Sequence, residues 1–280
     1  MKRSYFSAPY AVWMVVFTIF PIVFVGLYAI TTRRADGNDL YTGLTNIGNI
    51  FGNEGTYMKV LWRSLSLALQ CTAICLLLGY PCAYFLASKD FAKHKTLYVL
   101  ILLPMWMNFL LRTYASMGLL ERNGVINSIV TALGFKRLEL IGTQGAVLYG
   151  MVYNYLPFMI LPIHTVLKKM DQRVIEAAQD LGANPVRVFY KVTLPLSIPG
   201  IISGITMVFM PSVTTFAISS LLGSGNFMLI GDVIETQFMS ANNWNFGSAL
   251  SLFMTVLILI SIGLLNRMDK SKTGNGGGKW

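Results

Sequence analysis

Residues 176–195 read EAAQDLGANPVRVFYKVTLP, a short polar segment between two long apolar stretches. In and just before it, four apolar side chains recur at i, i+3, i+4 and i+7. These are Val174, Ala177, Ala178 and Leu181. This spacing places them on one face of a helix. The segment is therefore predicted to contain a helix that connects two membrane-spanning stretches.

The ends of this helix, and the start of a second one, are marked by capping residues. Asp171 suits the N-cap of the first helix, and Gly182 suits the left-handed conformation that ends it. Asn184 and Pro185 suit the N-cap and first position of a second short helix. We expect the next residues, LPLSIP at 194–199, to stop the second helix and lead into the fifth span.

The predicted helical face is short and contains alanines where packing inside the chain would favour Leu or Ile. Small side chains let a partner approach closely, and the polar residues Glu176, Gln179 and Asp180 flank them. This favours a helix that docks into a groove of another protein. The alternative is an interfacial helix lying on lipid. Two acids and few large apolar groups count against lipid, but the residues alone leave both open.

The whole chain has the composition of a membrane protein. Of its 280 residues, 54% are hydrophobic and 12% are charged, whereas soluble domains carry about 25% charged residues. A bilayer core requires about 20 predominantly apolar residues in a helix. We predict an all-α membrane protein with six transmembrane helices, at about 10–30, 64–87, 97–117, 143–165, 199–221 and 247–266. The first is too long for the apolar region of a signal peptide, so we interpret it as a retained span.

The distribution of Lys and Arg predicts the orientation. With the N-terminus inside, fourteen of these residues fall in inner segments and six in outer loops. Cytoplasmic loops collect Lys and Arg, so both termini and the segment 176–195 are predicted to be cytoplasmic. We expect a single transmembrane domain over 1–266, with a cytoplasmic coupling loop at about 166–198. The Gly-rich tail, 267–280, is expected to be cytoplasmic and disordered.

Motifs for chemistry on this chain are absent from the sequence. GNGGGK at 274–279 lacks the following Ser or Thr and the preceding strand of a phosphate-binding loop. No acidic residue lies well inside a predicted span, where ion-coupled carriers place Asp, Glu or His. Cys71, Cys75 and Cys82 have no His or carboxylate nearby, so we expect small buried hydrophobes rather than a metal site. An ion-coupled secondary transporter and a membrane enzyme are therefore disfavoured alternatives. A non-transporting scaffold is also disfavoured, because it would not need the Gly-punctuated helix pair at 171–195.

The segment 176–195 resembles the EAA loop of ABC importer permeases. That pattern reads EAA, three residues, Gly, nine residues and Ile-x-Leu-Pro; here Val192 replaces Ile, a conservative departure. The resemblance implies a coupling helix seated in a cleft of a cytoplasmic ATPase. The residues assigned to this coupling role are Glu176, Ala177, Ala178, Asp180, Gly182, Leu194 and Pro195.

Further segments resemble the spermidine/putrescine branch of these permeases. They are LGYPCAYFLA (78–87), LPMWMNFLLRTYA (103–115), YNYLPFMILPIHTVLKKMD (153–171) and LIGDVIETQFMSANNWNFGSALS (229–251). The last is the most distinctive. Permeases for phosphate, sulfate, molybdate and iron share the fold, so an importer of another small solute is the alternative.

The resemblance implies the type I ABC importer (MetI-like) permease fold in a bacterial cytoplasmic membrane. This chain would be one of two homologous permease subunits. Two cytoplasmic ATPase subunits would bind beneath and use ATP and Mg²⁺, while this chain binds no cofactor, metal or nucleic acid. An external substrate-binding protein would deliver a polyamine. ATP binding would draw the coupling helices together and rock the spans from inward- to outward-facing.

A polyamine is a flexible polycation, so its path should offer aromatic faces and acceptors rather than many fixed charges. The candidates on the third and fourth predicted spans are Trp106, Asn108, Tyr114, Tyr149, Tyr153 and Asn154. Packing or an interfacial aromatic belt is the alternative role for each. In the outer loop 222–246, Asp232 and Glu235 either attract a cation, meet the binding protein or form a solvated face. Arg112 is expected to be structural and paired with a carboxylate or backbone carbonyls.

Overall fold

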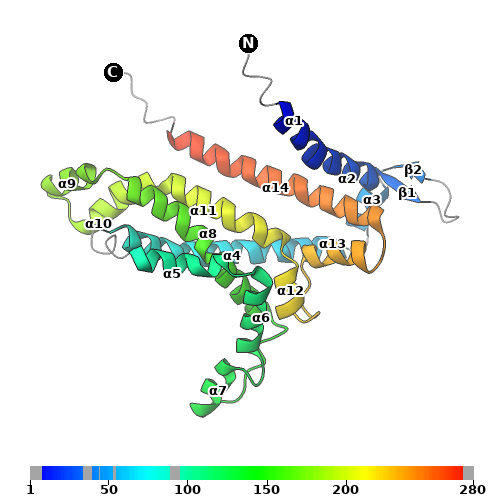
Figure 1. The fold of residues 1–280 in the computed structure, drawn as a ribbon, viewed down its shortest axis with the longest axis horizontal. Helices are drawn as coiled ribbons and strands as arrows, with labels where there is room; N and C mark the ends of the chain where they lie inside the picture. Colours follow the sequence, from blue (N-terminus) through cyan, green and yellow to red (C-terminus); the bar gives the residue numbers. More distant parts are fainter. Residues whose placement is uncertain (1–7, 34–39, 44, 53–54, 89–94, 274–280) are drawn as a thin grey trace. The chain divides into compact units, whose positions relative to one another are not determined.

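The computed structural model describes residues 8–33, 40–43, 45–52, 55–88 and 95–273 (Figure 1). The regular secondary structure of the described part is helical apart from one short antiparallel hairpin, in which β1 (Thr31–Arg33) pairs with β2 (Leu40–Thr42). The chain divides into two compact units. One comprises Met1–Trp62 and Ile230–Ile260, and the other comprises Arg63–Leu229 and Ser261–Trp280. The single domain over 1–266 stays a prediction.

The first unit contains α1 (Ala8–Met14), the π-helical turn η1 (Val15–Ile19), α2 (Phe20–Ile30), the hairpin, α3 (Thr45–Gly52) and α13 (Ile230–Met239). The second contains α5 (Lys95–Trp106), α6 (Phe109–Leu120), α7 (Val125–Ala132), α8 (Gln144–Lys169), α9 (Gln172–Asp180), α10 (Pro185–Val188), the π-helical turn η2 (Phe189–Thr193), α11 (Leu194–Thr214) and α12 (Ala217–Leu222). The long helices α4 (Thr56–Ala87) and α14 (Trp244–Thr273) contribute to both units. Residues 274–280 of the predicted tail lie outside the described residues.

Five helical segments are long and apolar enough to cross a membrane. They are Val12–Ile30, Thr56–Ala87, Gln144–Lys169, Pro185–Thr214 and Trp244–Leu264. A pair bent by 101°, Val99–Trp106 with Phe109–Ala132, is the sixth if it forms one span. Each of the six predicted stretches therefore corresponds to one of these segments.

The prediction of a continuous third span over 97–117 is wrong, because the helix breaks between Trp106 and Phe109. Asn108 has a non-helical backbone (ψ 131°), and its side-chain oxygen accepts a hydrogen bond from the N–H of Leu110 at 2.8 Å. Asn is a strong N-cap residue because it satisfies a backbone N–H that the helix itself cannot pair. A new helix, α6, therefore begins where averaged hydropathy predicts an uninterrupted one.

The predicted stop of the second loop helix at 194–199 is also wrong. α10, η2 and α11 form one helical segment from Pro185 to Thr214. In the π-helical turn, the N–H of Leu194 bonds to the carbonyl of Phe189, five residues back. Pro195 lies in the first turn of α11, directly after this widened turn, and π-bulges are a recognised local adjustment within helices. The predicted fifth span, 199–221, therefore begins earlier and ends at Thr214.

In the first unit, two buried or half-buried amides satisfy the end of α2. The side-chain amide of Asn46 donates to the carbonyls of Ala29 (3.3 Å) and Thr31 (2.9 Å), and that of Asn245 donates to Thr31 as well (2.7 Å). The last carbonyls of a helix lack partners within the helix. These contacts therefore fix the point where the first span ends.

In the second unit, α8 and α11 lie side by side and form the centre of the core (Figure 1). Gly200 and Gly204 are one turn apart on α11. A Cβ at Gly204 would lie 2.7 Å from Sδ of Met159, and one at Gly200 would lie 3.0 Å from the carbonyl oxygen of Pro162. Small residues at this spacing let membrane helices approach closely, and van der Waals packing then holds them together. This close pair carries the loop 171–193 at one end.

Candidate functional site

α9 and the turn after it have the structure that the capping residues predict. The side chain of Asp171 accepts a hydrogen bond from the N–H of Arg173 at 3.0 Å. Gly182 has φ +80°, and its N–H bonds to the carbonyl of Gln179 at 2.8 Å. The N–H of Ala183 bonds to the carbonyl of Ala178 at 3.1 Å, which completes a Schellman motif. The predicted helix end at Gly182 is confirmed.

The second predicted helix starts where expected. The side-chain oxygen of Asn184 accepts a hydrogen bond from the N–H of Arg187 at 2.8 Å, and Pro185 occupies the first position of α10. The missing N–H of a proline costs nothing at that position, because the first N–H groups of a helix have no partner in it. The loop is thus a helix, a turn of fixed geometry and a second helix.

Most of the apolar face of α9 is exposed. Leu181 is 89% exposed and Val174 is 46% exposed, Ala177 is exposed, and Ala178 is half-buried. Two further side chains of the loop, Val186 and Tyr190, are exposed as well. Charged side chains lie among them on the exposed surface, namely Arg173, Glu176, Asp180 and Arg187. We call this set of exposed residues the loop surface.

The opposite side of α9 covers a cavity of about 180 Å³. The cavity is lined by Ile175 of α9, by Tyr84 of α4, by Leu167 and Met170 at the end of α8, and by the buried Thr193 of η2. α9 therefore rests on the ends of three other elements through its less exposed side. Of the two coupling residues beyond the turn, Leu194 is half-buried and Pro195 is exposed, both in the first turn of α11.

The candidates on the third predicted span lie at and after the break. Trp106 ends α5 and is 78% exposed, Asn108 caps α6, and Tyr114 on α6 is 55% exposed. The side-chain oxygen of Asn108 is thus already used by the fold, which leaves only its amide N–H groups for a ligand. Trp106 and Tyr114 keep their aromatic faces accessible.

The candidates on α8 divide into an aromatic pair and a buried amide. The rings of Tyr149 and Tyr153 are stacked, with centroids 6.3 Å apart and planes 8° from parallel, and both side chains are partly exposed. Asn154 is fully buried; its amide donates to the carbonyl of Gly150 (2.9 Å) and to Oγ1 of Thr113 (3.5 Å). The structure therefore makes the tyrosines accessible and the asparagine part of the packing between α6 and α8.

Asp232 and Glu235 are both on α13 but in different surroundings. Asp232 is 6% exposed and lies in the first turn, where a carboxylate complements the helix dipole. Glu235, one turn later, is exposed. Both residues belong to the first compact unit, whereas the aromatic candidates belong to the second.

The chain matches the model of one protein family over nearly its whole length. Residues 3–273 match the model of the "binding-protein-dependent transport system inner membrane component" family. The chain belongs to this family. It is thus a membrane-embedded permease, the transport subunit rather than the ATPase of its system, and its place is the inner membrane.

Two relatives of this permease are spermidine/putrescine transport system permease proteins PotB. The one from Haemophilus influenzae is 39% identical over 264 residues, which cover 92% of this chain and 91% of the relative. The one from Escherichia coli K12 is 35% identical over 249 residues, which cover 88% and 90%. The similarity therefore extends over nearly the whole length of both chains.

Two solved structures share the fold of the permease. A bacterial ABC transporter that imports the acidic polysaccharide alginate matches with a TM-score of 0.75 at 17% identity, over 94% of this chain and 93% of the other. The MetNI methionine ABC transporter, in inward-facing conformations, matches with a TM-score of 0.55 at 16% identity, over 78% and 94%. The predicted type I importer (MetI-like) permease fold is confirmed.

Sequence reasoning missed an aromatic contact that ties the loop of the permease to α4. The ring of Phe189 in η2 makes edge-on contacts with Tyr80 and Tyr84, at centroid distances of 5.8 and 5.6 Å. The hydroxyl of Tyr80 is also hydrogen-bonded to Oγ of Ser197 on α11 at 3.0 Å. The only signal in the sequence is the four-residue spacing of Tyr80 and Tyr84, which puts them on one helix face.

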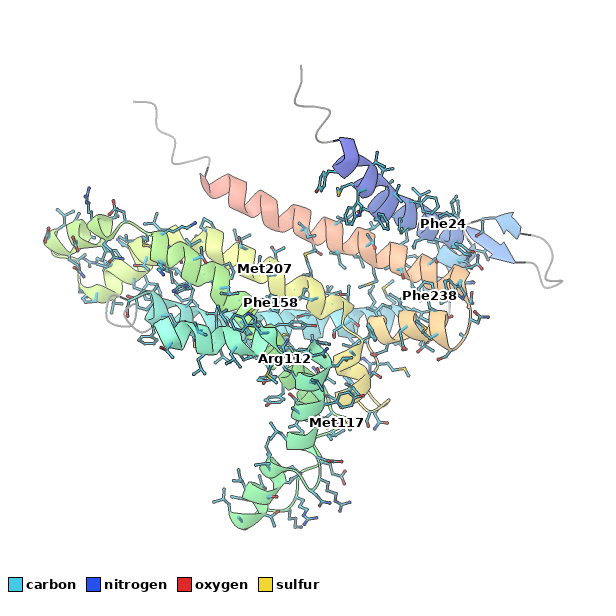
Figure 2. All side chains as sticks on the ribbon, viewed as in Figure 1. Phe24, Arg112, Met117, Phe158, Met207 and Phe238 are labelled. Atoms are coloured by element: carbon cyan, nitrogen blue, oxygen red, sulfur yellow. The ribbon has the colours of Figure 1, made fainter. Side chains whose placement is uncertain are left out.

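Arg112 of the permease lies on α6 (Figure 2) and is buried, with only 5% of its surface exposed. We expected it to pair with a carboxylate or with backbone carbonyls. Its Nε and Nη1 atoms have no hydrogen-bond partner among the residues that the structure describes. That expectation is therefore wrong for these two donors. Since burying an unpaired charge is costly, Arg112 marks the part of α6 that is least well satisfied by this chain alone.

Proposed function

We propose that this chain is a permease subunit of an ATP-driven ABC importer that moves polyamines, spermidine or putrescine, into the cell. The observation that carries the proposal is the similarity to two PotB permeases over nearly the full length of each chain. The loop surface supports the ABC importer class independently, because two of the three EAA positions, Glu176 and Ala177, are exposed on a helix of fixed geometry. An importer of another small solute is the alternative.

The loop surface is proposed to dock into a cleft of a cytoplasmic ATPase subunit. Leu181 is an almost uncovered apolar side chain and Val174 is about half exposed, and Ala177 between them leaves room for a partner. An amphipathic helix of this kind binds by laying its apolar side chains in a groove. The ratio of fourteen inner to six outer Lys and Arg residues supports a cytoplasmic location for this loop and for both termini.

Movement of the docked helix would reach the spans through two rigid connections. The first is the Schellman turn at Gly182, which leads directly into the helical segment Pro185–Thr214. The second is Phe189, held against Tyr80 and Tyr84 of α4. When the ATPases close on ATP, a displacement of α9 would therefore move α11 and α4 together. Small shifts at such a site become larger rearrangements because packed helices move as rigid bodies.

The path of the polyamine is proposed to use the exposed aromatic faces of the second unit. Tyr149 and Tyr153 form a stacked pair, and Trp106 and Tyr114 are accessible near the helix break. Aromatic faces attract ammonium groups without a fixed negative charge, so a polycation can bind and leave. Asn154 is proposed to support this surface rather than to touch the substrate, because it is fully buried. The exposed Glu235 is proposed to attract the cation or meet the binding protein, with buried Asp232 in a supporting role.

The complete transporter is proposed to contain four further subunits. They are a second homologous permease (PotC-like), two ATPase subunits (PotA-like) and an external substrate-binding protein (PotD-like). The family description itself refers to a binding-protein-dependent system, and one similar solved structure is an alginate ABC transporter in complex with a periplasmic protein bound to an alginate pentasaccharide. ATP and Mg²⁺ would be bound by the ATPase subunits, and this chain is proposed to bind no cofactor of its own.

The test is uptake by the reconstituted assembly. The chain is co-purified with its ATPase and second permease, placed in liposomes with ATP inside, and supplied with the binding protein and labelled spermidine outside. We expect uptake that requires ATP and is reduced by excess unlabelled putrescine but not by sulfate or phosphate. Uptake of an anion in place of spermidine would overturn the substrate, and a chain that purifies without an ATPase would overturn the class.

A further inference from the structure

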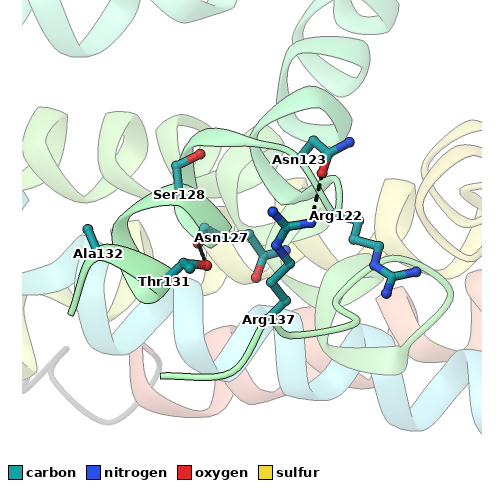
Figure 3. Close-up of a pocket in the computed structure, with 7 residues that line it drawn as sticks. All are labelled: Arg122, Asn123, Asn127, Ser128, Thr131, Ala132 and Arg137. Atoms are coloured by element: carbon teal, nitrogen blue, oxygen red, sulfur yellow. Dashed lines mark hydrogen bonds between the residues drawn. The ribbon is translucent and has the colours of Figure 1, made fainter. Parts of the chain in front are cut away.

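A polar cavity of about 350 Å³ lies beside α7, in the second unit (Figure 3). Arg122 lines it from the segment before the helix, and Arg137 lines it from the segment after the helix. Nη1 of Arg137 donates a hydrogen bond to Oδ1 of Asn123 at 3.2 Å. Ser128 and Thr131 line the cavity from α7 itself. We call this cavity the arginine pocket.

The arginine pocket is held together by one buried side chain, Asn127. Its amide donates to the carbonyls of Glu121 (3.1 Å) and Leu138 (3.0 Å), and its oxygen accepts from the N–H of Leu138 (2.8 Å). Asn127 is 1% exposed. The segments that carry the two arginines are thereby fixed to the same helix, so the pocket is a feature of the fold and not of a loose loop.

The chemistry of the arginine pocket selects an anion. Arg122 and Arg137 both line it, and neither Glu121 nor Glu139, the acidic residues of this segment, does. The hydroxyls of Ser128 and Thr131 already donate to carbonyls of their own helix, at 3.0 and 2.7 Å. The available donors are therefore guanidinium N–H groups, whose planar fork suits carboxylates and phosphates.

The position of α7 indicates which side of the membrane the anion comes from. α7 precedes α8 and α9 follows it, and α8 is long and apolar enough to span the membrane. The two short helices therefore lie at opposite faces of the bilayer. This step rests on the proposed function: with α9 on the cytoplasmic ATPase, the arginine pocket is outside, where a substrate-binding protein docks.

The exposed apolar residues of α7 help to decide whether the arginine pocket meets a protein partner or a lipid. Val125, Ile129 and Leu133 recur every four residues and are all more than half exposed. At 100° per residue, this stripe lies on roughly the opposite side of the helix from Thr131 and the buried Asn127. If the stripe rests on lipid, as interfacial helices do, the arginine pocket faces water. We propose that Arg122 and Arg137 bind surface carboxylates of the substrate-binding protein, the partner on which a system of this family depends.

The test measures binding of the spermidine-loaded binding protein to the complete transporter in phosphatidylcholine nanodiscs. Arg137→Glu should raise its Kd about tenfold, and Arg137→Gln should raise it less, because charge complementarity at an interface rim sets association and its salt dependence. The control is Lys136→Gln, which removes the same charge from an exposed neighbour that does not line the pocket and should change the Kd less than about twofold. ATP hydrolysis without the binding protein should be unchanged in all variants, which shows that they are assembled.

Four results overturn the inference. An unchanged Kd for both Arg137 variants excludes the pocket, and an equal loss for Lys136→Gln means that only diffuse charge matters. A loss that appears only in nanodiscs containing phosphatidylglycerol means that an anionic lipid headgroup is the occupant. If Arg137→Gln lowers basal ATP hydrolysis, Arg137→Lys and Arg122→Gln replace it; the inference fails if neither weakens binding. A wild-type transporter that the binding protein neither binds nor stimulates would instead overturn the proposed function.

Discussion

α7 and α9 are two short helices at opposite ends of α8, and they end in the same way. Each is followed by a glycine at positive φ, Gly134 at +84° and Gly182 at +80°. Each has the two hydrogen bonds of a Schellman motif: Gly134 to Thr131 and Phe135 to Val130 in one, and Gly182 to Gln179 and Ala183 to Ala178 in the other. The two helices therefore end with the same backbone conformation and the same pattern of hydrogen bonds.

The two helices differ in what they present and in how they are attached. α9 exposes small and apolar side chains and continues, after its glycine, into the span Pro185–Thr214. α7 adjoins a pocket with two arginines and is attached through α6, which is strongly bent from α5. Helix-ending signals therefore locate such elements, whereas the side chains around them distinguish an apolar docking face from an ionic one.

The largest effect is expected from Gly182→Val. There is open space around a Cβ at both Gly182 and Gly134, so the cost at either is backbone strain of about 1–2 kcal/mol. At Gly182 that strain either opens the turn or redirects α9, and we expect ATP-dependent uptake to fall about 5–30-fold. Gly134→Val is the matched control and should leave co-purification of the ATPase intact. Equal loss of ATPase from both variants would show that the strain unfolds the permease and says nothing about coupling.

The second effect concerns the face of α9. Ala177→Asp places a charge between Val174 and Leu181, and we expect ATPase association to weaken about tenfold, since an unpaired charge would enter an apolar interface. Gln179→Asp makes the same change of charge on the other side of this exposed helix and should have little effect. Association is measured by pull-down of the ATPase with the tagged permease. Similar behaviour of the two variants would contradict a one-sided docking face.

A smaller effect is expected from loosening the attachment of the loop to the spans. Tyr80→Phe removes the hydroxyl that is bonded to Ser197 and keeps the ring that contacts Phe189. The loss of one hydrogen bond corresponds to about 1 kcal/mol, seen as a lower thermal unfolding midpoint of the purified complex. Tyr84→Phe should change it less, because Tyr84 contributes its ring to Phe189 and is partly exposed. A larger decrease in the unfolding midpoint for Tyr84→Phe would show that Tyr84, rather than Tyr80, makes the main connection between the loop and α4.

The smallest effect is expected from ionic strength, which should act differently on binding at α7 and binding at α9. Raising the salt concentration from about 0.05 to 0.3 M shortens the screening length of exposed charges about 2.4-fold, which is enough to weaken ion pairs. Binding-protein affinity, proposed to depend on the arginine pocket, should fall several-fold. ATPase association, proposed to depend on apolar contacts, should change little. If ATPase association falls more than binding-protein affinity, charge matters more at α9 than at the arginine pocket.

Much of the loop was predictable to the residue because its signals are local. A cap at Asp171 or Asn184 needs only backbone groups two or three positions away, and Gly182 needs only its own conformational freedom. Asn108 carried the same kind of signal, yet hydropathy averaged over a whole span concealed it, and the residue was assigned to the substrate path. The break between α5 and α6 was therefore missed.

By itself, the sequence determined the membrane class, the spans and the short helices at their ends, because apolar length and capping are properties of neighbouring residues. Only the tertiary structure decided that Phe189 lies against Tyr80 and Tyr84, that Asn154 is buried while Tyr149 and Tyr153 are exposed, and that Arg122 and Arg137 line one cavity. The physical reason is distance along the chain. The Phe189 contacts and the burial of Asn154 depend on how separate helices pack, and one helix's periodicity carries no information about the side chains of the next. The cavity at Arg122 and Arg137 depends on how the two segments that flank α7 fold back onto it.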